Sequence, residues 1–486
     1  MEKNGMRFDN TAREMRAILA DKMIPFWLTR SVDTTHGGFL TSFDANGAFD
    51  GNDVKYLVTQ CRMIWGFSAL LPFAKKADQR AMEHAADAYY TGSRKEAQTT
   101  LTGGDDWLEN EWLRVTVDSA LITLQDKATG KTFPHVNLLE EEADAGDAWD
   151  FSPPWIPGEV VRSSRFDFVS RLEELEPVRA RLSTSGVMSV PACLHGDARS
   201  QDRADMPIRF EFTMYPGIRR VDVKLTLDNT ARDHRVRLRV PMGVKTGSVR
   251  SQSHLAVINR PIARPVEQEP WRQPPTQLLP FREWLACEDQ SVGLAVAFKG
   301  MYDYEAHVHP LTGRSEVSVT LVRGFDLMGR RNTMQRGGPA SDAVYTPGAQ
   351  CQGLQVMEWA YLPYAADAND KAPFLKLAQA FLYPPVTHAI RSEPEGATSD
   401  GIPMPFRWNG DNIQFSAFKR SDAQDGYILR LYENQGRHTE VDLHTHGFRQ
   451  AFLAGMDEDA REELPMQDGA LRLAFAPYKA LTIKLR

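Results

Sequence analysis

Cysteine is scarce in this sequence, and its scarcity excludes several kinds of site. The 486 residues hold four cysteines, Cys61, Cys193, Cys287 and Cys351, which lie far apart and form no Cys-x-x-Cys pair. Structural disulfides and a zinc knuckle are therefore not expected, and a reducing compartment fits this usage best.

Long apolar runs and clusters of one charge are also missing. No stretch approaches the roughly 18 to 20 apolar residues that a membrane helix needs, and residues 1–16 contain no apolar segment of a signal peptide. Lysine and arginine, 57 in all, are scattered among 64 aspartates and glutamates, for a net charge of -7. We predict a cytoplasmic protein with no nucleic-acid or membrane partner.

Sequence motifs for common cofactors are absent as well. There is no Gly-rich phosphate loop, no serine nucleophile elbow and no nucleotide fingerprint. The pairs His307/His309 and His444/His446 could each place two imidazoles on one side of a strand, but apart from Asp442 no third ligand is suitably spaced. We therefore predict solvent-facing histidines and no metal site.

Helical periodicity characterises the first ninety residues. Residues 7–28 space their apolar side chains as one amphipathic helix does, residues 54–74 return to that spacing, and residues 78–92 offer a third helix that ends at Gly92. Residues 93–106 are small, polar and glycine-containing, which predicts a linker between a helical segment, 1–92, and the rest of the chain.

From Trp107 onward the pattern is that of short strands. Alternating apolar and polar residues recur between connections rich in proline and glycine, with scarcely a helical stretch of ten residues. This predicts a mainly β fold, with a large antiparallel β-sandwich over residues 107–391 and a C-terminal β-subdomain over 392–486.

One connection stands out chemically. The loop GDAWDFSPP, residues 146–154, places two carboxylates, an indole and two prolines within nine residues, a composition suited to a rigid lip that grips a sugar. The acidic run at 140–142 just before it is expected to be a solvated face, as such runs usually are.

Four motifs in the β-rich part resemble a known family. They are LENEWLRV, GDAWDFSPP, TLVRGFDLMGRRN with GPASDAVYTPGAQCQG, and FSAFKRSDAQDGYILRLYENQGR. In this order they are similar to the C-terminal β-domain of the family-38 glycoside hydrolases, the α-mannosidases, across residues 107–486. The resemblance implies a galactose-mutarotase-like supersandwich, an α-mannoside-like carbohydrate ligand and a place in mannose metabolism.

The same resemblance implies site residues. Trp149 stands where the family carries an aromatic residue, more often tyrosine, that touches the sugar, and Asp147 lies in the same loop; the alternative for Trp149 is a residue that covers the core. Arg260, in LAVINRPIAR, resembles an arginine that projects toward the bound sugar, where its planar fork of donors suits vicinal hydroxyls. A surface salt bridge is the alternative for Arg260.

Residues 7–92 resemble a different family. The strings MIPFWLTRSVDTTHGGFLTSFDANG and KYLVTQCRMIWGFSAL are similar to the N-terminal signature of the N-acylglucosamine 2-epimerases and cellobiose 2-epimerases, whose full fold is an α/α barrel. The resemblance implies that Arg62 belongs to a sugar pocket, with Trp65 one helical turn later. Only the first few helices of such a barrel are represented.

Nothing in residues 1–106 resembles the N-terminal domain that supplies family-38 enzymes with zinc, a nucleophile and an acid/base. We therefore predict an α-mannosidase-related, carbohydrate-binding protein without the catalytic barrel. No catalytic residue and no cofactor are expected in this chain, and zinc belongs to intact relatives. The alternatives are a sugar epimerase or isomerase acting through Arg62, and a structural β-module that forms a homo-oligomer or partners a separate catalytic chain.

Overall fold

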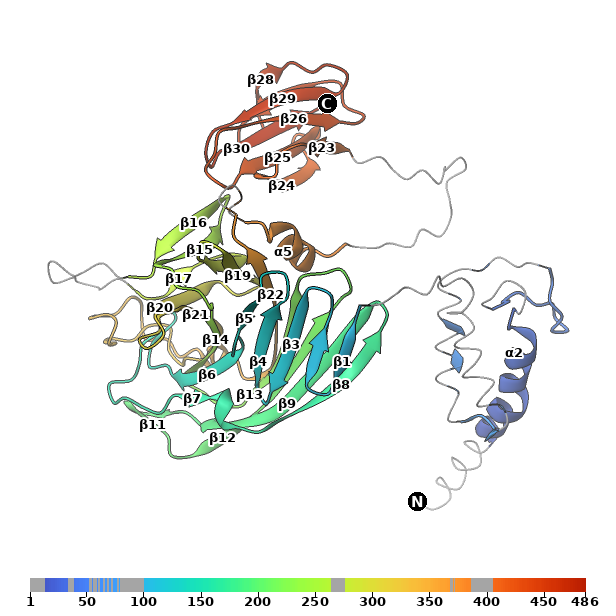
Figure 1. Cartoon of the computed structure of the whole chain (residues 1–486), viewed down its shortest axis with the longest axis horizontal. Coiled ribbons are helices and arrows are strands. Elements are labelled where there is room, and N and C mark those ends of the chain that lie inside the picture. Colours follow the sequence, from blue (N-terminus) through green and yellow to red (C-terminus); the bar gives the residue numbers. More distant parts are fainter. Residues whose placement is uncertain are drawn as a thin grey trace. The chain divides into compact units, whose positions relative to one another are not determined.

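The structure is a computed structural model, and it divides the chain into two compact units, Met1–Gln98 and Thr99–Arg486 (Figure 1). The described residues are 14–33, 39–51, 55, 59, 62–63, 66–67, 70, 73–76, 78, 100–263, 276–367, 370, 372–385 and 405–486. Within them, no helix combines the length and the apolar character that crossing a membrane would require.

The first unit begins with the predicted amphipathic helix. Residues 14–18 are helical, a π-helical turn η1 (Leu19–Met23) follows, and α2 (Ile24–Arg30) completes the segment, with Pro25 in its first turn, where a missing N–H costs nothing. Its core contains Ile24, Phe39 and Phe67. Residues 7–13 of the predicted helix, and nearly all of the one predicted at 78–92, lie outside the described residues.

The boundary between the units falls between Gln98 and Thr99, inside the predicted linker 93–106. Residues 93–99 lie outside the described part, but β1 (Thr102–Gly104) pairs with β2 (Trp107–Glu109). The end of the predicted linker is therefore a strand. Glycines at 103 and 104 suit this place because Cβ atoms there would lie 2.8 Å from Leu108 and 2.7 Å from Trp107.

Three antiparallel sheets form the main body of the second unit. The nine-stranded sheet runs in the order β16 (Ala256–Pro261), β15 (Ser248–Ser253), β18 (Trp284–Glu288), β19 (Val292–Lys299), β22 (Gly353–Ala365), β13 (Val221–Asn229), β12 (Arg203–Met214), β9 (Arg179–Pro191) and β8 (Phe168–Glu176). The six-stranded sheet runs β17 (Leu279–Pro280), β20 (Asp303–Val308), β21 (Ser315–Arg323), β14 (His234–Pro241), β6 (Leu138–Ala143) and β7 (Val161–Arg162). The five-stranded sheet runs β1, β2, β3 (Leu113–Asp118), β4 (Leu121–Asp126) and β5 (Lys131–Phe133).

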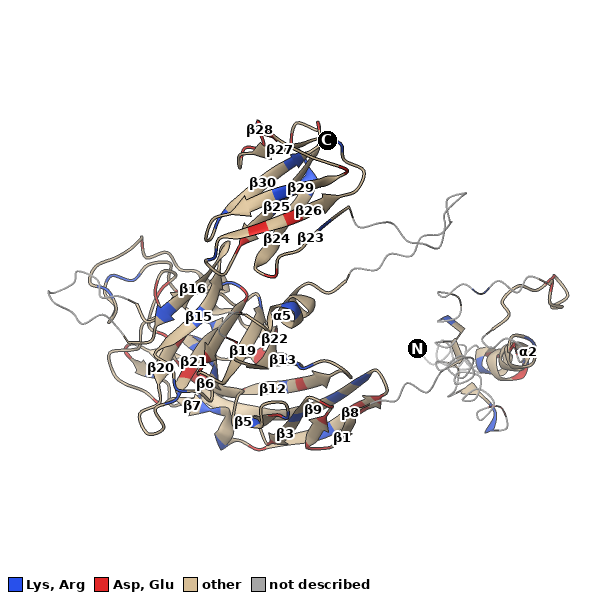
Figure 2. Ribbon diagram, turned by 45° about the horizontal axis from the view of Figure 1, so that its top comes forward, with Lys and Arg blue, Asp and Glu red and all other residues tan. Residues whose placement is uncertain are grey.

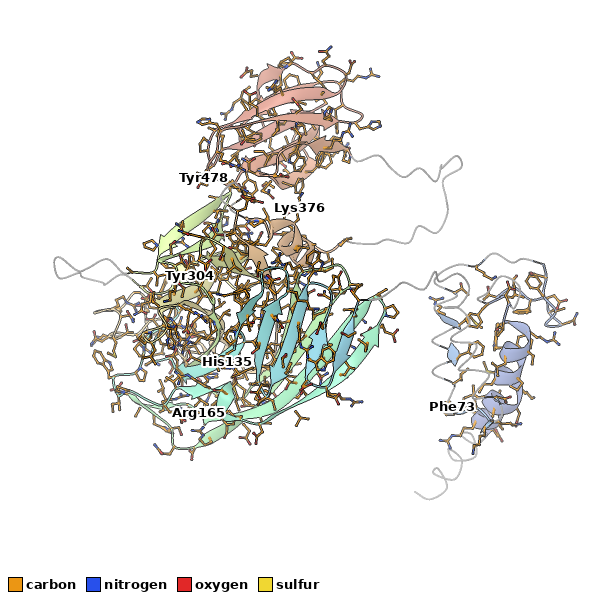
Figure 3. All side chains as sticks on the ribbon, in the orientation of Figure 1. Phe73, His135, Arg165, Tyr304, Lys376 and Tyr478 are labelled. Atoms are coloured by element: carbon orange, nitrogen blue, oxygen red, sulfur yellow. The ribbon has the colours of Figure 1, made fainter. Side chains whose placement is uncertain are left out.

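A single large core lies between these sheets, because alternate residues of each strand turn inward. Along β13, every second residue from Val221 to Asn229 is buried. The core receives Val115 from the five-stranded sheet, Phe210 from the nine-stranded sheet and Leu238 from the six-stranded sheet. Tyr304, labelled in Figure 3, is among its largest fully buried side chains, as are Trp359 and Tyr361.

The C-terminal strands form a separate sandwich with its own core. One sheet contains β23 (Phe406–Trp408), β26 (Thr439–Thr445) and β29 (Ala470–Phe475), and the other contains β24 (Ile413–Arg420), β25 (Tyr427–Glu433), β30 (Ala480–Leu485), β27 (Ala451–Ala454) and β28 (Ala460–Leu464). Short elements complete the unit: η3 (Ser163–Arg165), β10 (Leu194–His195), β11 (Ala198–Arg199), η4 (Pro347–Gln350) and α5 (Leu375–Leu382). The predicted mainly β, antiparallel fold is confirmed.

The acidic run at 140–142 was wrongly predicted to be solvated. These glutamates lie on β6, where Glu140 and Glu141 are buried, and β6 pairs with β14 so that Glu140 faces Arg237 and Glu142 faces Arg235. Each pair is joined by an ion pair, and further charged residues continue the row across the sheet (Figure 2). The run is the acidic half of a cross-strand charge ladder, and its complement is the alternating arginine of HRVRLRV.

Candidate functional site

The loop at 144–154 leaves β6 as a tightly closed turn. Gly146 is required there, since a Cβ atom would lie 2.0 Å from the carbonyl oxygen of Asp150. The backbone N–H of Asp147 donates to that same carbonyl at 3.0 Å, and the N–H of Ala145 donates to the carbonyl of Ser152 at 2.8 Å. The buried Asp144 carboxylate accepts the N–H of Gly146 at 2.8 Å, so side chains reinforce the turn.

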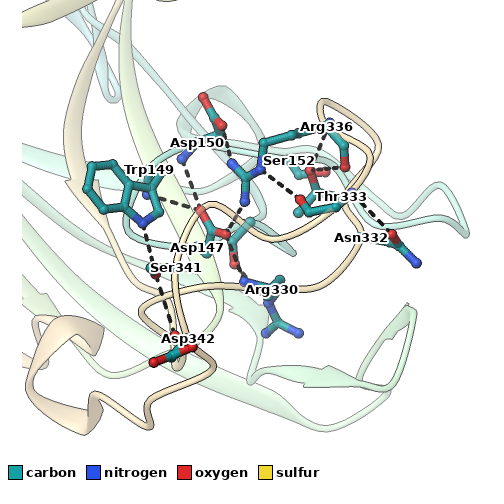
Figure 4. A network of polar contacts seen from close by, with 12 residues as sticks. Asp147, Trp149, Asp150, Ser152, Arg330, Asn332, Thr333, Arg336, Ser341 and Asp342 are labelled. Carbon is teal, nitrogen blue, oxygen red and sulfur yellow. Dashed lines mark hydrogen bonds and ion pairs between the residues drawn. The ribbon is translucent and has the colours of Figure 1, made fainter. Parts of the chain in front are cut away.

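A second segment, residues 324–346, docks onto this loop from the end of β21. The N–H of Ala148 donates to the carbonyl of Met328 at 3.3 Å, and the N–H of Met334 donates to the hydroxyl of Ser152 at 3.0 Å. The segment closes on itself through the bridge Leu327–Tyr345. Two motifs that are about 180 positions apart thus form one structure (Figure 4).

Arginines hold the two segments together. Arg336 pairs with both Asp147 and Asp150 and donates to the carbonyl of Gly338 at 3.1 Å. Arg330 donates through Nε to the carbonyl of Gly146 at 2.8 Å. Because only 9% of the Arg336 side chain is exposed, its two ion pairs are largely shielded from water.

Asp147 is the centre of this network. Its Oδ1 accepts the N–H groups of Trp149 at 3.0 Å and Asp150 at 3.2 Å, and its Oδ2 accepts the N–H of Arg330 at 2.8 Å and the Arg336 guanidinium. Burial by itself would raise the pKa of the Asp147 carboxyl, but the Arg330 N–H, the Arg336 side chain and the other two N–H groups together lower it below its ordinary value. The carboxylate is therefore ionised and locked in place.

Trp149 is the group that this network presents to the outside. Trp149 is 60% exposed, and its indole N–H donates to the hydroxyl of Ser341 at 3.0 Å. In Figure 4, Trp149 and Ser341 lie at one end of the network, and Asn332 and Thr333 lie at the other. The indole does not cover the core of the described residues. It is a fixed, accessible aromatic face of the kind that can stack on an apolar face of a ligand.

Further exposed apolar side chains lie on the same two stretches of chain. They are Trp155, Ile156, Met328, Met334, Val344 and Tyr345. The charge ladder contacts the loop through Arg235, whose guanidinium lies 3.3 Å from the ring centroid of Phe151. The ion pairs around Asp147 thus lie inside the site, while its exposed surface carries these apolar side chains together with Arg331, Asn332 and Asp342.

Within the second unit, the hydrogen bonds of Arg260 are separate from those of Asp147 and Trp149. Asp147 is fully buried, so it positions Trp149 and does not itself touch a ligand. Arg260 on β16 donates to the hydroxyl of Ser251 at 3.1 Å and to the carbonyl of Pro280 at 2.6 Å, and no recorded contact joins it to the loop at 144–154. Arg260 therefore makes hydrogen bonds within the fold, and among the described residues it forms no ion pair.

Arg62 belongs to the first unit. It is exposed and helical, and it lines a small apolar cleft of about 110 Å³ with Trp27, Met63 and Phe67 among its neighbours. Trp65 lies outside the described residues. Among the described residues that line this cleft, Arg62 is the one polar side chain.

Arg330 lies in a quoted motif and Arg336 lies between two of them, but sequence reasoning singled out neither residue. Both follow TLVRGFDLMG within a few positions, and nothing in their spacing indicates which carboxylates they meet. One signal was available: a loop with two aspartates needs cations if it is to be buried.

No metal-ligand set stands beside this network. Within the parts of the chain that the structure describes, no three histidine, cysteine, aspartate or glutamate side chains gather as metal ligands would. His307 instead makes a 2.8 Å contact from Nε2 to Glu316. Zinc, which the resemblance assigns to intact relatives, has no fitting site in these residues.

Comparison with known proteins relates the β-rich part to one family. Residues 108–326 match the family model "Glycosyl hydrolases family 38 C-terminal domain", and residues 412–483 match "Glycosyl hydrolases family 38 C-terminal beta sandwich domain". The predicted family is confirmed for this part. Neither match includes residues 7–92, whose resemblance to 2-epimerases remains a prediction.

Individual similar proteins and structures are consistent with these family matches. A protein of Halalkalibacterium halodurans named "Putative mannosylglycerate hydrolase" is 23% identical over 408 residues, which are 80% of this chain and 43% of that protein. An α-mannosidase structure from Enterococcus faecalis V583 superposes with a TM-score of 0.67 at 20% identity, covering 79% of this chain and 43% of that one. A family-38 structure from E. faecalis gives 0.65 at 19% identity, covering 79% and 44%. This chain spans less than half the length of each relative.

Proposed function

We propose that this chain, which is related to glycosyl hydrolase family 38 through its β-rich part, binds α-mannoside-like sugars at the rim formed by residues 144–156 and 324–346. The observation that carries the proposal is Trp149, an indole left 60% exposed by a loop whose Asp144 and Asp147 are buried in ion pairs with arginines. A rigid exposed indole loses little entropy when it stacks on a sugar ring.

The rim supports binding better than bond cleavage. Retaining hydrolysis needs two accessible carboxyls about 5 to 5.5 Å apart. Beside Trp149, Asp144 and Asp147 are fully buried, and each pairs with an arginine. Neither can reach a sugar as nucleophile or acid. Asp150 and Asp326 are also paired with arginines, so Asp342 is the one exposed carboxyl of the two rim segments and has no second exposed carboxyl there to act with. We expect catalytic carboxylates, and the surface that covers the exposed apolar side chains, to come from another part of the protein or from a separate chain.

The proposed compartment is reducing. Among the described residues Cys193, Cys287 and Cys351 are free, in keeping with a cytoplasmic location and mannose metabolism there.

Binding of methyl α-mannoside and of mannosylglycerate to the full chain, measured by isothermal titration, tests the proposal. We expect saturable binding that Trp149→Ala weakens by about tenfold or more. Trp112→Ala is the matched control, because Trp112 is also a partly exposed tryptophan but lies between β2 and β3, away from both rim segments.

Equal affinity in the parent chain and in Trp149→Ala would refute the proposed role of the rim. So would binding that is lost equally in Trp112→Ala. Hydrolysis of an aryl α-mannoside by the purified chain with added zinc, surviving rigorous purification, would show that the carboxylates have been misjudged.

A further inference from the structure

A second polar pocket lies on the outer face of the nine-stranded sheet, where β16, β15 and β18 form one end of it. Its volume is about 410 Å³, which falls within the range of about 300 to 1,000 Å³ typical of small-molecule sites. The polar side chains that line it are Thr246, Ser248, Arg250, Asn259, Glu288, Asp367 and the phenol of Tyr478. None of these residues belongs to the Trp149 rim.

The floor of this pocket is a row of cross-strand neighbours. Arg250 on β15 lies directly opposite Asn259 on β16 and opposite Ala286 on β18, so the three side chains share one face. The methyl group of Ala286 leaves space above the sheet, while Arg250 and Asn259 present donors and an acceptor side by side.

Glu288 is held in a defined position beside this row. It pairs with Arg250, and its Oε2 accepts the hydroxyl of Tyr364 at 3.0 Å. Tyr364 in turn needs glycine at 293, where a Cβ atom would lie 2.2 Å from its ring. The sequence therefore places a glycine where it lets Tyr364 orient the carboxylate of the pocket.

Tyr478, labelled in Figure 3, belongs to the C-terminal sandwich, between β29 and β30, and lines the pocket. Its φ angle is 57°, in the left-handed region that a tyrosine adopts only at a cost in free energy. The buried Glu433 carboxylate maintains this turn by accepting the N–H groups of Tyr478 at 2.9 Å and of Gly436 at 2.8 Å. The turn leaves Tyr478 47% exposed at the pocket.

Strained backbone that is held by a buried carboxylate and that presents an exposed aromatic ring is characteristic of functional sites. The lining of this pocket also indicates the ligand. One arginine stands beside two carboxylates, Glu288 and Asp367, which disfavours an anion. Adjacent donors and acceptors with one aromatic face suit vicinal hydroxyls and the apolar face of a pyranose.

We propose that this pocket is a second carbohydrate-binding site, which takes a neutral sugar unit of an oligosaccharide and acts independently of the Trp149 rim. The Tyr478 ring stacks on the sugar, and Arg250, Asn259 and Glu288 bind its hydroxyl groups.

The test uses full-length Trp149→Ala protein, so that the rim contributes no stacking. Saturation-transfer NMR and isothermal titration measure binding of two neutral disaccharides, α-1,6-mannobiose and cellobiose, and of one acidic sugar, glucuronic acid. We expect at least one disaccharide to bind and the acidic sugar to bind at least about tenfold more weakly.

Two pocket variants then assign the site. Tyr478→Gly removes the ring and also relieves the left-handed backbone, so it keeps the fold, and Asn259→Ala removes an exposed amide. Each should weaken binding by about tenfold, whereas Tyr302→Ala, an exposed tyrosine in the turn between β19 and β20, should leave it unchanged.

Three results would overturn the proposal: no disaccharide binding in the Trp149→Ala protein, binding unaffected by both pocket variants, or preference for the acidic sugar. Because the Trp149 rim is disabled throughout, failure here is distinct from failure of the function proposed for that rim.

Discussion

Replacing Arg336 by methionine would remove the guanidinium that joins the two rim segments. Methionine keeps an unbranched apolar side chain in the space but carries no charge and donates no hydrogen bond. Asp147 would retain the three backbone N–H groups of Trp149, Asp150 and Arg330, and would lose its charged partner. The consequence is a buried carboxylate with incomplete compensation.

The expected cost follows from that geometry. Removing one partner of a buried ion pair costs about 3–5 kcal/mol, and the retained N–H donors place this case near about 3 kcal/mol. At about 1.4 kcal/mol per tenfold, opening of the loop becomes about 100-fold more frequent. We expect the rim to lose order while the three hydrophobic cores of the second unit keep theirs.

Hydrogen exchange is the suitable assay, because a chain with two units and several cores has no single free energy of unfolding. The amides of Trp149, Asp150 and Arg330 report directly, since each donates to Asp147. Their protection should fall by about 100-fold in Arg336→Met. Amides of the central strand β13 should be unaffected.

The matched control is Arg461→Met. Arg461 pairs with Asp457 at 3.1 Å, but the two side chains are 62% and 55% exposed. Exposed pairs contribute about 0–1 kcal/mol, so the rim amides should exchange as in the parent chain. Unchanged rim exchange in Arg336→Met, or equal loss in both variants, would refute the reasoning.

Three further predictions concern single groups. Because the folded-state pKa of Asp147 is lowered, its stabilising contribution is present above the ordinary carboxyl pKa of about 3.9 and is lost as pH falls through the lowered value. Protection of the rim amides from hydrogen exchange should therefore decline only below about pH 4. A decline between pH 7 and 5 would contradict this. Gly146→Ala should destabilise the loop by about 1–3 kcal/mol, whereas Gly247→Ala, which meets no atom within 4 Å, should be tolerated in the same measurement. Burial raises the pKa of the Cys287 thiol to about 12, so alkylation of the folded protein at pH 8, read by mass spectrometry, should modify the exposed Cys351 and spare Cys287; equal modification would show that Cys287 is accessible.

Local pattern was sufficient for the elements and for the exposed aromatic group. Alternation along β13 predicts a strand with one buried face, and the structure has that strand. The composition of GDAWDFSPP indicated a rigid aromatic lip, and the loop does close around Gly146 and expose Trp149. These features depend on neighbours within a few residues, which the sequence displays directly.

Pairing between distant segments was beyond reach of the sequence. The run at 140–142 was expected to be solvated because its arginine partners on β14 lie about 95 positions away and become neighbours only through sheet register. Arg260 occupies a suggestive motif, and in the structure its Nη1 donates to Ser251 and Pro280, two partners that the sequence does not indicate. Whether a charged side chain faces a ligand or another residue depends on what tertiary folding places opposite it.

The sequence by itself thus determined a mainly β chain related to family 38, because strand periodicity and turn chemistry are local and motif order is preserved along the chain. Only the tertiary structure decided that Asp147 is a buried support and Trp149 the exposed face, and only it brought Tyr478 to the pocket of Arg250. The physical reason is that burial and ionic pairing depend on contacts between residues far apart in the chain, and these contacts form only when the whole unit folds.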